Sequence, residues 1–304
     1  MMRSLYSGVA GLRTHQTRMD VIGNNIANVN TVGFKASRVT FRDVIYQTLS
    51  GASSPTEEAL RGGINPYQIG LGVQVSSIDK LMTRAGPQTT DRPLDAYIDG
   101  EGFFKVRGTG EEEDAPEYYT RVGNFSFDAQ GFLVDSNGNY VMGMNGDMTS
   151  VLEWSIDDGP ATEIDEGGEH DATYIQVPPE DFMRLTAISI GPSGVITAYD
   201  PQAEPPDEIV VLGQIALYKF INTDGLVQVG QTYFQPSTNS GAAGEIQAGF
   251  AGTGNVISSR LEMSNVELAK EFTDMIITQR GFQANSRIIT VSDEMLQELV
   301  NLKR

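Results

Sequence analysis

Two rows of apolar side chains with a seven-residue spacing, one at each end of the chain, constrain the fold more than any other feature of the sequence. Such spacing is typical of helices that bury a narrow apolar seam against a partner helix. The first row ends where asparagines and Gly33 follow, and the second begins after the glycine-rich stretch 249–254. The N-terminal row consists of Leu5, Leu12, Met19 and Ile26, with Ile22 between them; the C-terminal row consists of Leu268, Met275, Phe282, Ile289 and Leu296, with Phe272 beside it.

Each of these helices needs a partner, because an isolated helix of this length is only marginally stable in water. Chain termini are usually frayed and polar, yet here they are the most regular segments of the sequence. This placement favours pairing of the two terminal helices with each other. Periodicity alone leaves one alternative open, in which each apolar row packs on the chain's own core.

Between the ends, the apolar spacing changes from helical to alternating. Residues 94–106 and 118–143 alternate apolar and polar side chains, and 208–235 continue this pattern. Turns are predicted at 128–131, 135–138 and 222–225, where Asp, Asn and Gly gather. No helical spacing separates these strands, which argues against the alternating strands and helices of a nucleotide-binding sheet. The predicted fold class is therefore α+β, with a mainly β middle.

The changes in spacing divide the chain into parts. Residues 1–33 and 255–304 form the predicted helical domain, with the helices paired in the manner of a coiled coil. Residues 34–92 are expected to be a linker or extended arm, because 50–66 are rich in Gly, Ser and Pro. Residues 93–254 form the predicted outer β domain. An acidic insertion is expected within it at about 145–205.

Acidic residues are concentrated in the middle of the chain. The formal net charge is -19, and residues 101–200 carry twenty Asp and Glu against four Lys and Arg. Such a chain repels phosphate backbones, so nucleic acid is not an expected partner. No apolar run of about 18 residues is present, and we expect no membrane span. Arg13, His15 and Arg18 also interrupt any secretory signal, which by itself would indicate the cytoplasm.

We expect no catalytic, cofactor-binding or metal-binding site, and therefore no enzyme. The chain has no Cys and two His, too few for a thiolate or histidine-rich metal site. The carboxylates of 157–171 lie among Gly and Pro, where no apolar neighbours would raise a pKa for acid–base catalysis. Asp135, Asn137 and Asn139 begin like a calcium loop, but Tyr140 stands where that loop needs Gly. The stretch 249–254 lacks the Lys of a phosphate loop.

Two alternatives from other functional classes are weakly supported. A secreted carbohydrate-active enzyme would need a dry carboxylate pair. An adhesin would need an exposed aromatic patch, for which Trp154 alone is thin support.

Four asparagines at the end of the first helix need an explanation of their own. Asn is a mediocre helix residue, so this group weakens the helix where its seam continues. A helix stop before Gly33 explains part of the group. Because each amide both donates and accepts, these side chains are also expected to bind carbonyl groups of their own or a neighbouring chain. The group consists of Asn24, Asn25, Asn28 and Asn30.

Several long motifs resemble the family of flagellar rod and hook proteins. The stretch MDVIGNNIANVNTVGFK (19–35) is similar to the N-terminal signature of that family, and residues 264–302 are similar to its C-terminal helix. Between them, QIGLGVQV (68–75), LDAYIDGEGFF (94–104) and YTRVGNFSFDAQGFLV (119–134) match in order. The resemblance covers roughly residues 1–145 and 210–304. Residues 145–205 match poorly.

The resemblance implies a structural subunit of the flagellar hook, which polymerises into a flexible tube between rod and filament. A distal rod subunit is the alternative; the ending LVNLKR and the stretch GGINPYQIGLG favour the hook. The family also implies paired terminal helices as the inner wall of the tube. Export through the flagellum's own secretion apparatus is implied as well, which replaces the cytoplasmic interpretation with an extracellular one.

The partners implied are copies of the same chain, the neighbouring rod, hook-junction and hook-cap proteins, and the export apparatus. Contacts between subunits are expected along the inner helices. The residues expected to make these contacts are Leu5, Leu12, Met19, Ile22, Asn24, Asn25, Ile26, Asn28, Leu268, Phe272, Met275, Phe282, Ile289 and Leu296.

Overall fold

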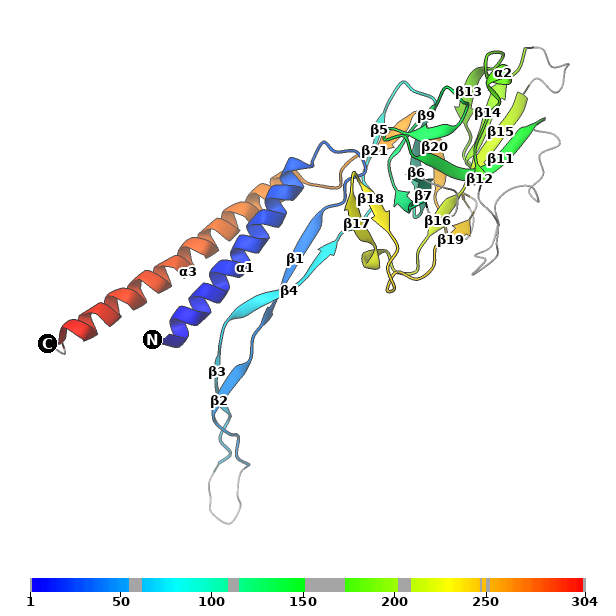
Figure 1. The fold of residues 1–304 in the computed structure, drawn as a ribbon. Coiled ribbons are helices and arrows are strands. Elements are labelled where there is room, and N and C mark those ends of the chain that lie inside the picture. The colour runs from blue at the N-terminus through cyan, green and yellow to red at the C-terminus, as the bar shows by residue number, and fades with distance from the viewer. Residues whose placement is uncertain are drawn as a thin grey trace. The chain divides into compact units, whose positions relative to one another are not determined.

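The computed structural model of the protein describes residues 2–54, 62–108, 115–150, 173–201, 209–246, 248–249 and 252–302. These residues fall into two units (Figure 1). The first unit comprises residues 1–29, 36–81 and 266–304, and the second comprises 30–35 and 82–265. Helices at both chain ends and strands between them confirm the α+β class.

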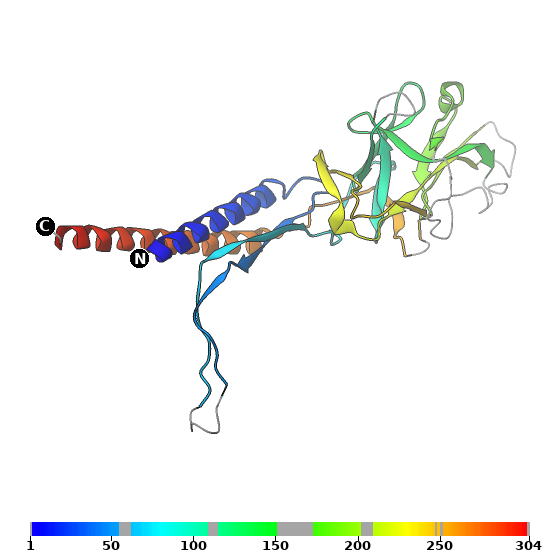
Figure 2. The same ribbon diagram turned by 60° about the horizontal axis from the view of Figure 1, so that its bottom comes forward.

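The first unit contains the two long helices and a two-stranded ribbon. Helix α1 (Met2–Ala27) and helix α3 (Leu268–Leu302) lie side by side in both views, with the N- and C-termini at the same end (Figures 1 and 2). Strand β1 (Ser37–Asp43) pairs antiparallel with β4 (Val73–Lys80), and both contact α1. Farther out, β2 (Tyr46–Ser50) pairs with β3 (Tyr67–Gly70). The predicted arm is therefore an antiparallel ribbon for most of its described length.

The second unit is built almost entirely of antiparallel strands. Its longest path has the order β17-β18-β8-β7-β11-β10-β9-β6-β20. Its elements are β5 (Pro87–Thr89), β6 (Asp95–Asp99), β7 (Phe103–Arg107), β8 (Glu117–Thr120), β9 (Gly123–Phe127), β10 (Leu133–Asp135), β11 (Tyr140–Ser150), β12 (Thr173–Tyr174), α2 (Pro179–Phe182), β13 (Thr186–Ile190), β14 (Val195–Tyr199), β15 (Ile209–Ile215), β16 (Leu217–Lys219), η3 (Thr223–Gly225), β17 (Val227–Gly230), β18 (Tyr233–Gln235), β19 (Gly244–Ile246), β20 (Asn255–Ser258) and β21 (Arg260–Glu262).

Alternation along the strands fills two apolar clusters. In β7, Phe103 and Phe104 are both buried but point to opposite faces, so they enter different clusters. Phe104 packs edge to face with Phe125 of β9, with ring centroids 5.1 Å apart. Phe103 packs in the same manner with Phe220 and Phe234. Buried aromatic pairs of this kind hold the β unit together.

The predicted turns are present and follow from short polar side chains and glycine. Asp128 Oδ1 accepts hydrogen bonds from the backbone of Gln130 and Phe132, and Asp135 Oδ1 accepts from the backbone of Asn137 and Asn139. Gly131 and Gly138 have φ of 84° and 83°, which glycine adopts without strain. Asn222 caps the short 3-10 turn η3 by accepting from Asp224.

Three segments differ from the predicted boundaries. Residues 255–262, predicted to belong with the C-terminal helix, form β20 and β21, which pair with β6 and β5. Residues 36–81 are grouped with the helices rather than forming a separate linker. Residues 173–201, predicted to belong to an acidic insertion, contribute the buried side chains Ile175, Val177 and Ile196 to the main core. Short helix α2 also interrupts the otherwise β middle.

Candidate assembly surface

Helices α1 and α3 meet in an antiparallel arrangement with a constant register. As residue numbers rise along α1, those of the contacting residues fall along α3. Polar contacts run along much of the interface: the Arg18 guanidinium and the Asp274 carboxylate form an ion pair of 2.9 Å, and Ser4 Oγ lies 3.4 Å from Ser292 Oγ. The facing pairs are Ser4 with Ser292, Gly8 with Ile289, Gly11 with Asn285, His15 with Gly281, Arg18 with Asp274 and Asn25 with Glu271.

Small residues let the two helices approach closely. A Cβ atom added to Gly11 would lie 2.7 Å from Asn285 Nδ2, and one added to Gly281 would lie 2.7 Å from the His15 ring. Asn285 and His15 thus occupy space that only glycine leaves open. Burial and the nearby Arg18 guanidinium lower the pKa of His15 below its ordinary value, which favours the neutral ring.

The seven-residue row predicted an apolar side of α3 facing α1, but the side that contacts α1 is partly polar. Thr278 and Ser292 are the two buried residues of α3, and each donates its hydroxyl to a carbonyl one turn earlier. With Glu271 and Asn285 they form a second row of seven-residue spacing, one the sequence analysis missed. Its signal was present in the sequence as small and polar residues at a heptad interval beside the apolar row.

The residues predicted to form the seam differ in their burial. Ile22 and Asn25 are buried, Asn24 is exposed, and the remaining α1 residues are partly buried. Met275, Ile289 and Leu296 are partly buried, whereas Leu268, Phe272 and Phe282 are exposed. A straight helix drifts by about 20° for each seven residues, so a strict seven-residue row moves around the helix surface. The partly buried residues at the N-terminal end are Leu5, Leu12, Met19 and Ile26 of α1 and Asn28, which follows the helix.

A row of large apolar side chains remains exposed on one side of α3. We call it the exposed stripe: its members are separated by 3, 4 or 11 residues, so they share one side of the helix. Exposed fractions range from 44% for Ile288 to 82% for Leu302. Large contiguous patches of exposed apolar surface are typical of interaction sites. The exposed stripe consists of Ile277, Ile288, Val291, Met295, Leu299 and Leu302.

Among the described residues, the far end of α3 has no partner helix alongside it. Helix α3 has 35 residues and α1 has 26, and Ser292 already lies opposite Ser4 near the start of α1. Leu299, Val300 and Leu302 therefore extend beyond α1, and all three are exposed. The ribbon of the same unit adds the exposed side chains of Tyr46 and Tyr67.

One of the four asparagines holds the chain together where α1 ends. Asn25 is 1% exposed; its Nδ2 donates to the Ser37 carbonyl at 2.9 Å, and its Oδ1 accepts from the Ser37 amide at 3.0 Å. The same Nδ2 lies 3.3 Å from Glu271 Oε1, and burial raises the pKa of that carboxyl. Asn28 donates to the Asn24 carbonyl. Asn25 therefore fixes the start of β1 within its own chain.

A buried charge cluster in the β unit joins residues far apart in the sequence. Lys35 Nζ and Glu262 Oε1 are 2.7 Å apart, with side chains 1% and 0% exposed. Arg121 Nη1 lies 3.7 Å from Glu262 Oε2. Glu262 Oε1 also accepts from the Ala85 amide, and the Glu262 carbonyl accepts from the Gly33 amide. Sequence analysis missed this cluster, although Lys35 ends one of the family motifs.

The other candidate residues are the carboxylates of the 135–139 turn and of 157–171. The Asp135 carboxylate is engaged by its own turn and by Tyr233, as a hairpin requires. The carboxylates of 157–171 lie outside the described residues. Within the described ranges, no group of three or more His, Asp or Glu is placed to hold a metal ion. Nor does any described helix combine the length and apolar character needed to cross a membrane.

Three models of flagellar protein families match the chain. The model described as flagella basal body rod protein matches residues 5–35, within α1 and the turn that follows it. The flagellar hook protein FlgE/F/G D1 domain matches residues 97–198. The flagellar basal body rod FlgEFG protein C-terminal model matches residues 257–302. The second match extends through much of the segment for which we expected a poor match.

Relatives of full length carry two names. The flagellar basal-body rod protein FlgG of Bacillus subtilis (strain 168) is 45% identical over 305 residues, which cover 100% of each chain. FlgG of Borreliella burgdorferi is 33% identical over 305 residues, again covering 100% of each. The flagellar hook protein FlgE of Borreliella burgdorferi is 32% identical, but over an alignment of 448 residues that covers 100% of both chains. The two FlgG alignments are one residue longer than this chain of 304 residues, whereas the FlgE alignment is far longer than the chain.

Proposed function

We propose that this chain, which belongs to the family of flagellar rod and hook proteins, is a structural subunit of the distal rod and polymerises with copies of itself. One observation carries the choice of rod over hook: the 45% identity to FlgG extends over 100% of both chains in an alignment of 305 residues, one more than this chain has. The hook interpretation that we favoured from the sequence has weaker support, because the FlgE alignments of 448 and 471 residues require long insertions.

The exposed stripe supports polymerisation as the role of the terminal helices. Removing apolar surface from water by covering it with a partner stabilises the complex by about 25 cal/mol for each Å² that is covered. Neighbouring subunits that bring their own α3 helices against the stripe would remove this surface from water. We extend the proposal to the predicted contact residues that lie exposed beside α1, namely Leu268, Phe272 and Phe282. Coiled-coil packing between the helices belongs to the same proposal.

The place and partners of the subunit follow from this role. As a rod subunit it would be exported through the flagellar secretion apparatus and would add to a growing tube, in contact with other rod proteins. The hook-junction and hook-cap proteins remain partners only under the hook alternative. A role in mechanical coupling requires no catalysis.

Immunogold labelling of isolated basal bodies with attached hooks tests the proposal. Antibodies raised against the β unit should label the rod segment near the hook and leave the hook itself unlabelled. Labelling along the length of the hook would overturn the choice of rod. A null mutant provides the matched control, because it should lose both the label and every structure assembled after the rod.

A further inference from the structure

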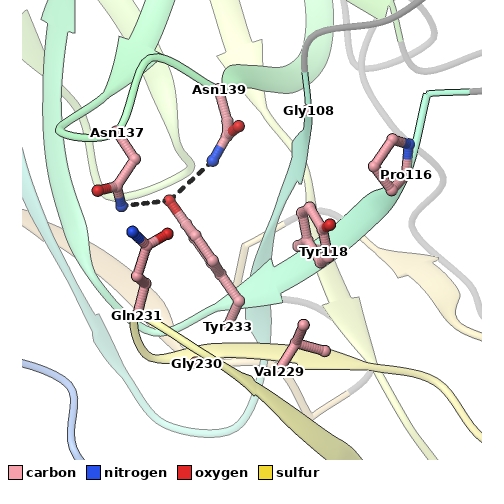
Figure 3. A pocket seen from close by; sticks show the side chains of 9 residues that line it. All are labelled: Gly108, Pro116, Tyr118, Asn137, Asn139, Val229, Gly230, Gln231 and Tyr233. Atoms are coloured by element: carbon pink, nitrogen blue, oxygen red, sulfur yellow. Dashed lines mark hydrogen bonds between the residues drawn. The ribbon is translucent and has the colours of Figure 1, made fainter.

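A pocket of about 390 Å³ lies within the β unit, and its lining includes none of the residues used in the proposed function (Figure 3). Its volume is within the range of about 300–1,000 Å³ that is typical of small-molecule sites. The turn between β10 and β11 supplies Asn137 and Asn139, strand β8 supplies Tyr118, and the hairpin between β17 and β18 supplies Gln231 and Tyr233. Figure 3 shows both asparagine side chains directed at the Tyr233 hydroxyl.

A hydrogen-bond network fixes the orientation of the two asparagine amides. The Tyr233 hydroxyl donates to Asp135 Oδ2 and accepts from Asn137 Nδ2 at 2.6 Å and from Asn139 Nδ2 at 2.8 Å. Because the hydroxyl proton is committed to Asp135, each amide must present its NH₂ group to the tyrosine. Each carbonyl oxygen is then turned away from it. Burial and the Asp135 hydrogen bond raise the pKa of Tyr233 to about 12, so the donor persists at neutral pH.

The hairpin that carries Gln231 has an uncommon backbone. Gln231 and Thr232 have φ of 51° and 62°, values that a two-residue hairpin turn usually reaches with Asn and Gly. A β-branched residue such as Thr rarely adopts this conformation, and backbone strain of this kind gathers at binding sites. The turn places the exposed Gln231 at the edge of the pocket.

The pocket lining indicates the chemistry of a ligand. Tyr118 and Tyr233 stack with ring centroids 5.4 Å apart and an angle of 21° between their planes. The described lining residues carry no charged side chain, and the nearby Asp135 carboxylate is occupied by Tyr233 and by backbone amides. The site therefore offers fixed carbonyl acceptors, an adaptable glutamine amide and aromatic surface. Such a set suits a neutral ligand with several hydroxyl donors and apolar C–H faces.

We propose that this pocket binds one unit of a neutral saccharide. Sugar hydroxyls would donate to the Asn137 and Asn139 carbonyl oxygens, Gln231 would contact a further hydroxyl, and a C–H face of the ring would lie against Tyr118. The binding site does not depend on polymerisation, so its test uses the monomer in solution and leaves the rod proposal untouched.

Isothermal titration of the full-length monomer with N-acetylchitotriose and with cellotriose tests the assignment. We expect weak, saturable binding of at least one of them, with trigalacturonic acid and a neutral Gly-Ser peptide as probes that should not bind. Gln231→Ala and Asn139→Ala should each weaken binding about fivefold, the effect of one lost hydrogen bond. Gln88→Ala is the matched control, because Gln88 is an exposed glutamine of β5 that is not part of the pocket lining.

The variants also separate binding from folding. Gln231 and Asn137 are exposed, so replacement of either by Ala should leave the far-UV circular dichroism unchanged, and binding is then measured on a folded chain. The proposal would be overturned if neither saccharide bound at 10-fold the lowest concentration at which the titration could detect binding. Equal binding by wild type, Gln231→Ala and Asn137→Ala would do so as well, as would a preference for the acidic sugar or the peptide.

Discussion

Replacement of Glu262 by Gln should destabilise the β unit strongly, because it removes the carboxylate that two buried cations share. Lys35 and Arg121 would remain, with side chains 1% and 5% exposed. Gln has nearly the same shape as Glu, so packing at Ala85 and Gly33 should change little. Breaking a buried ion pair by removing one partner costs about 3–5 kcal/mol.

The part of this cost that arises from Lys35 has an upper limit that depends on pH. Lys35 can lose its proton, and at pH 7 this costs about 4.6 kcal/mol, since an unfolded Lys has a pKa near 10.4 and each unit is worth about 1.36 kcal/mol. At pH 9 the same step costs only about 1.9 kcal/mol. Burial already lowers the pKa of Lys35 in the wild-type chain. The unfolded state of the variant then binds more protons than the folded state, so stability rises with pH.

Hydrogen exchange of peptides from β5 to β7 and from β21, measured in a urea series, reports the stability of this unit by itself. We expect Glu262→Gln to lose about 3–5 kcal/mol at pH 7 and about half as much at pH 9. Glu117→Gln is the control: that carboxylate binds Lys105 and Arg107 with 34% of its side chain exposed, and it should cost about 0–1 kcal/mol. Lys35→Met combined with Glu262→Gln should recover part of the loss. A loss below about 1 kcal/mol at pH 7, or one that grows with pH, would refute the reasoning.

Four other predictions address assembly, packing and titration. Ile288→Asp in the exposed stripe should raise the critical concentration for polymerisation by about 10- to 100-fold, because it removes the free energy of burying one apolar side chain. Gln283→Asp, on another side of α3, should leave sedimentation of the polymer unchanged. Gly281→Leu should overpack against His15, which costs about 1–3 kcal/mol and lowers the melting temperature of the helical circular dichroism signal. Gly23→Ala should raise that melting temperature, because no atom lies within 4 Å of the added Cβ. The stability of the β unit should fall as pH rises from about 10 towards 12, because folded Tyr233 retains a proton that the unfolded chain releases; Tyr233→Phe should weaken this slope in an alkaline unfolding series. Deletion of 157–171 should leave polymerisation intact, because this acidic stretch is predicted to face solvent; loss of polymer in electron micrographs would contradict that placement.

The sequence predicted those features that depend on neighbouring residues along the chain. Helical spacing at the ends and alternation in the middle predicted the α+β class, because both periods follow from local backbone geometry. The turns at Asp128 and Asp135 were predictable for the same reason, since each carboxylate binds amides two and four residues later. Long motifs around α1 and α3 identified the family.

Tertiary structure decided which residues meet across the chain. The seven-residue row suggested Phe272 and Phe282 at the helix interface, but Gly11 and Gly281 let Asn285 and His15 fill it, which left large apolar side chains exposed. Burial of Lys35 beside Glu262 depends on residues 227 positions apart. No local period could reveal that contact, because its energy arises from removing both charges from water together. The two helices contact each other along one side of α3, and the exposed stripe lies on α3 in contact with solvent.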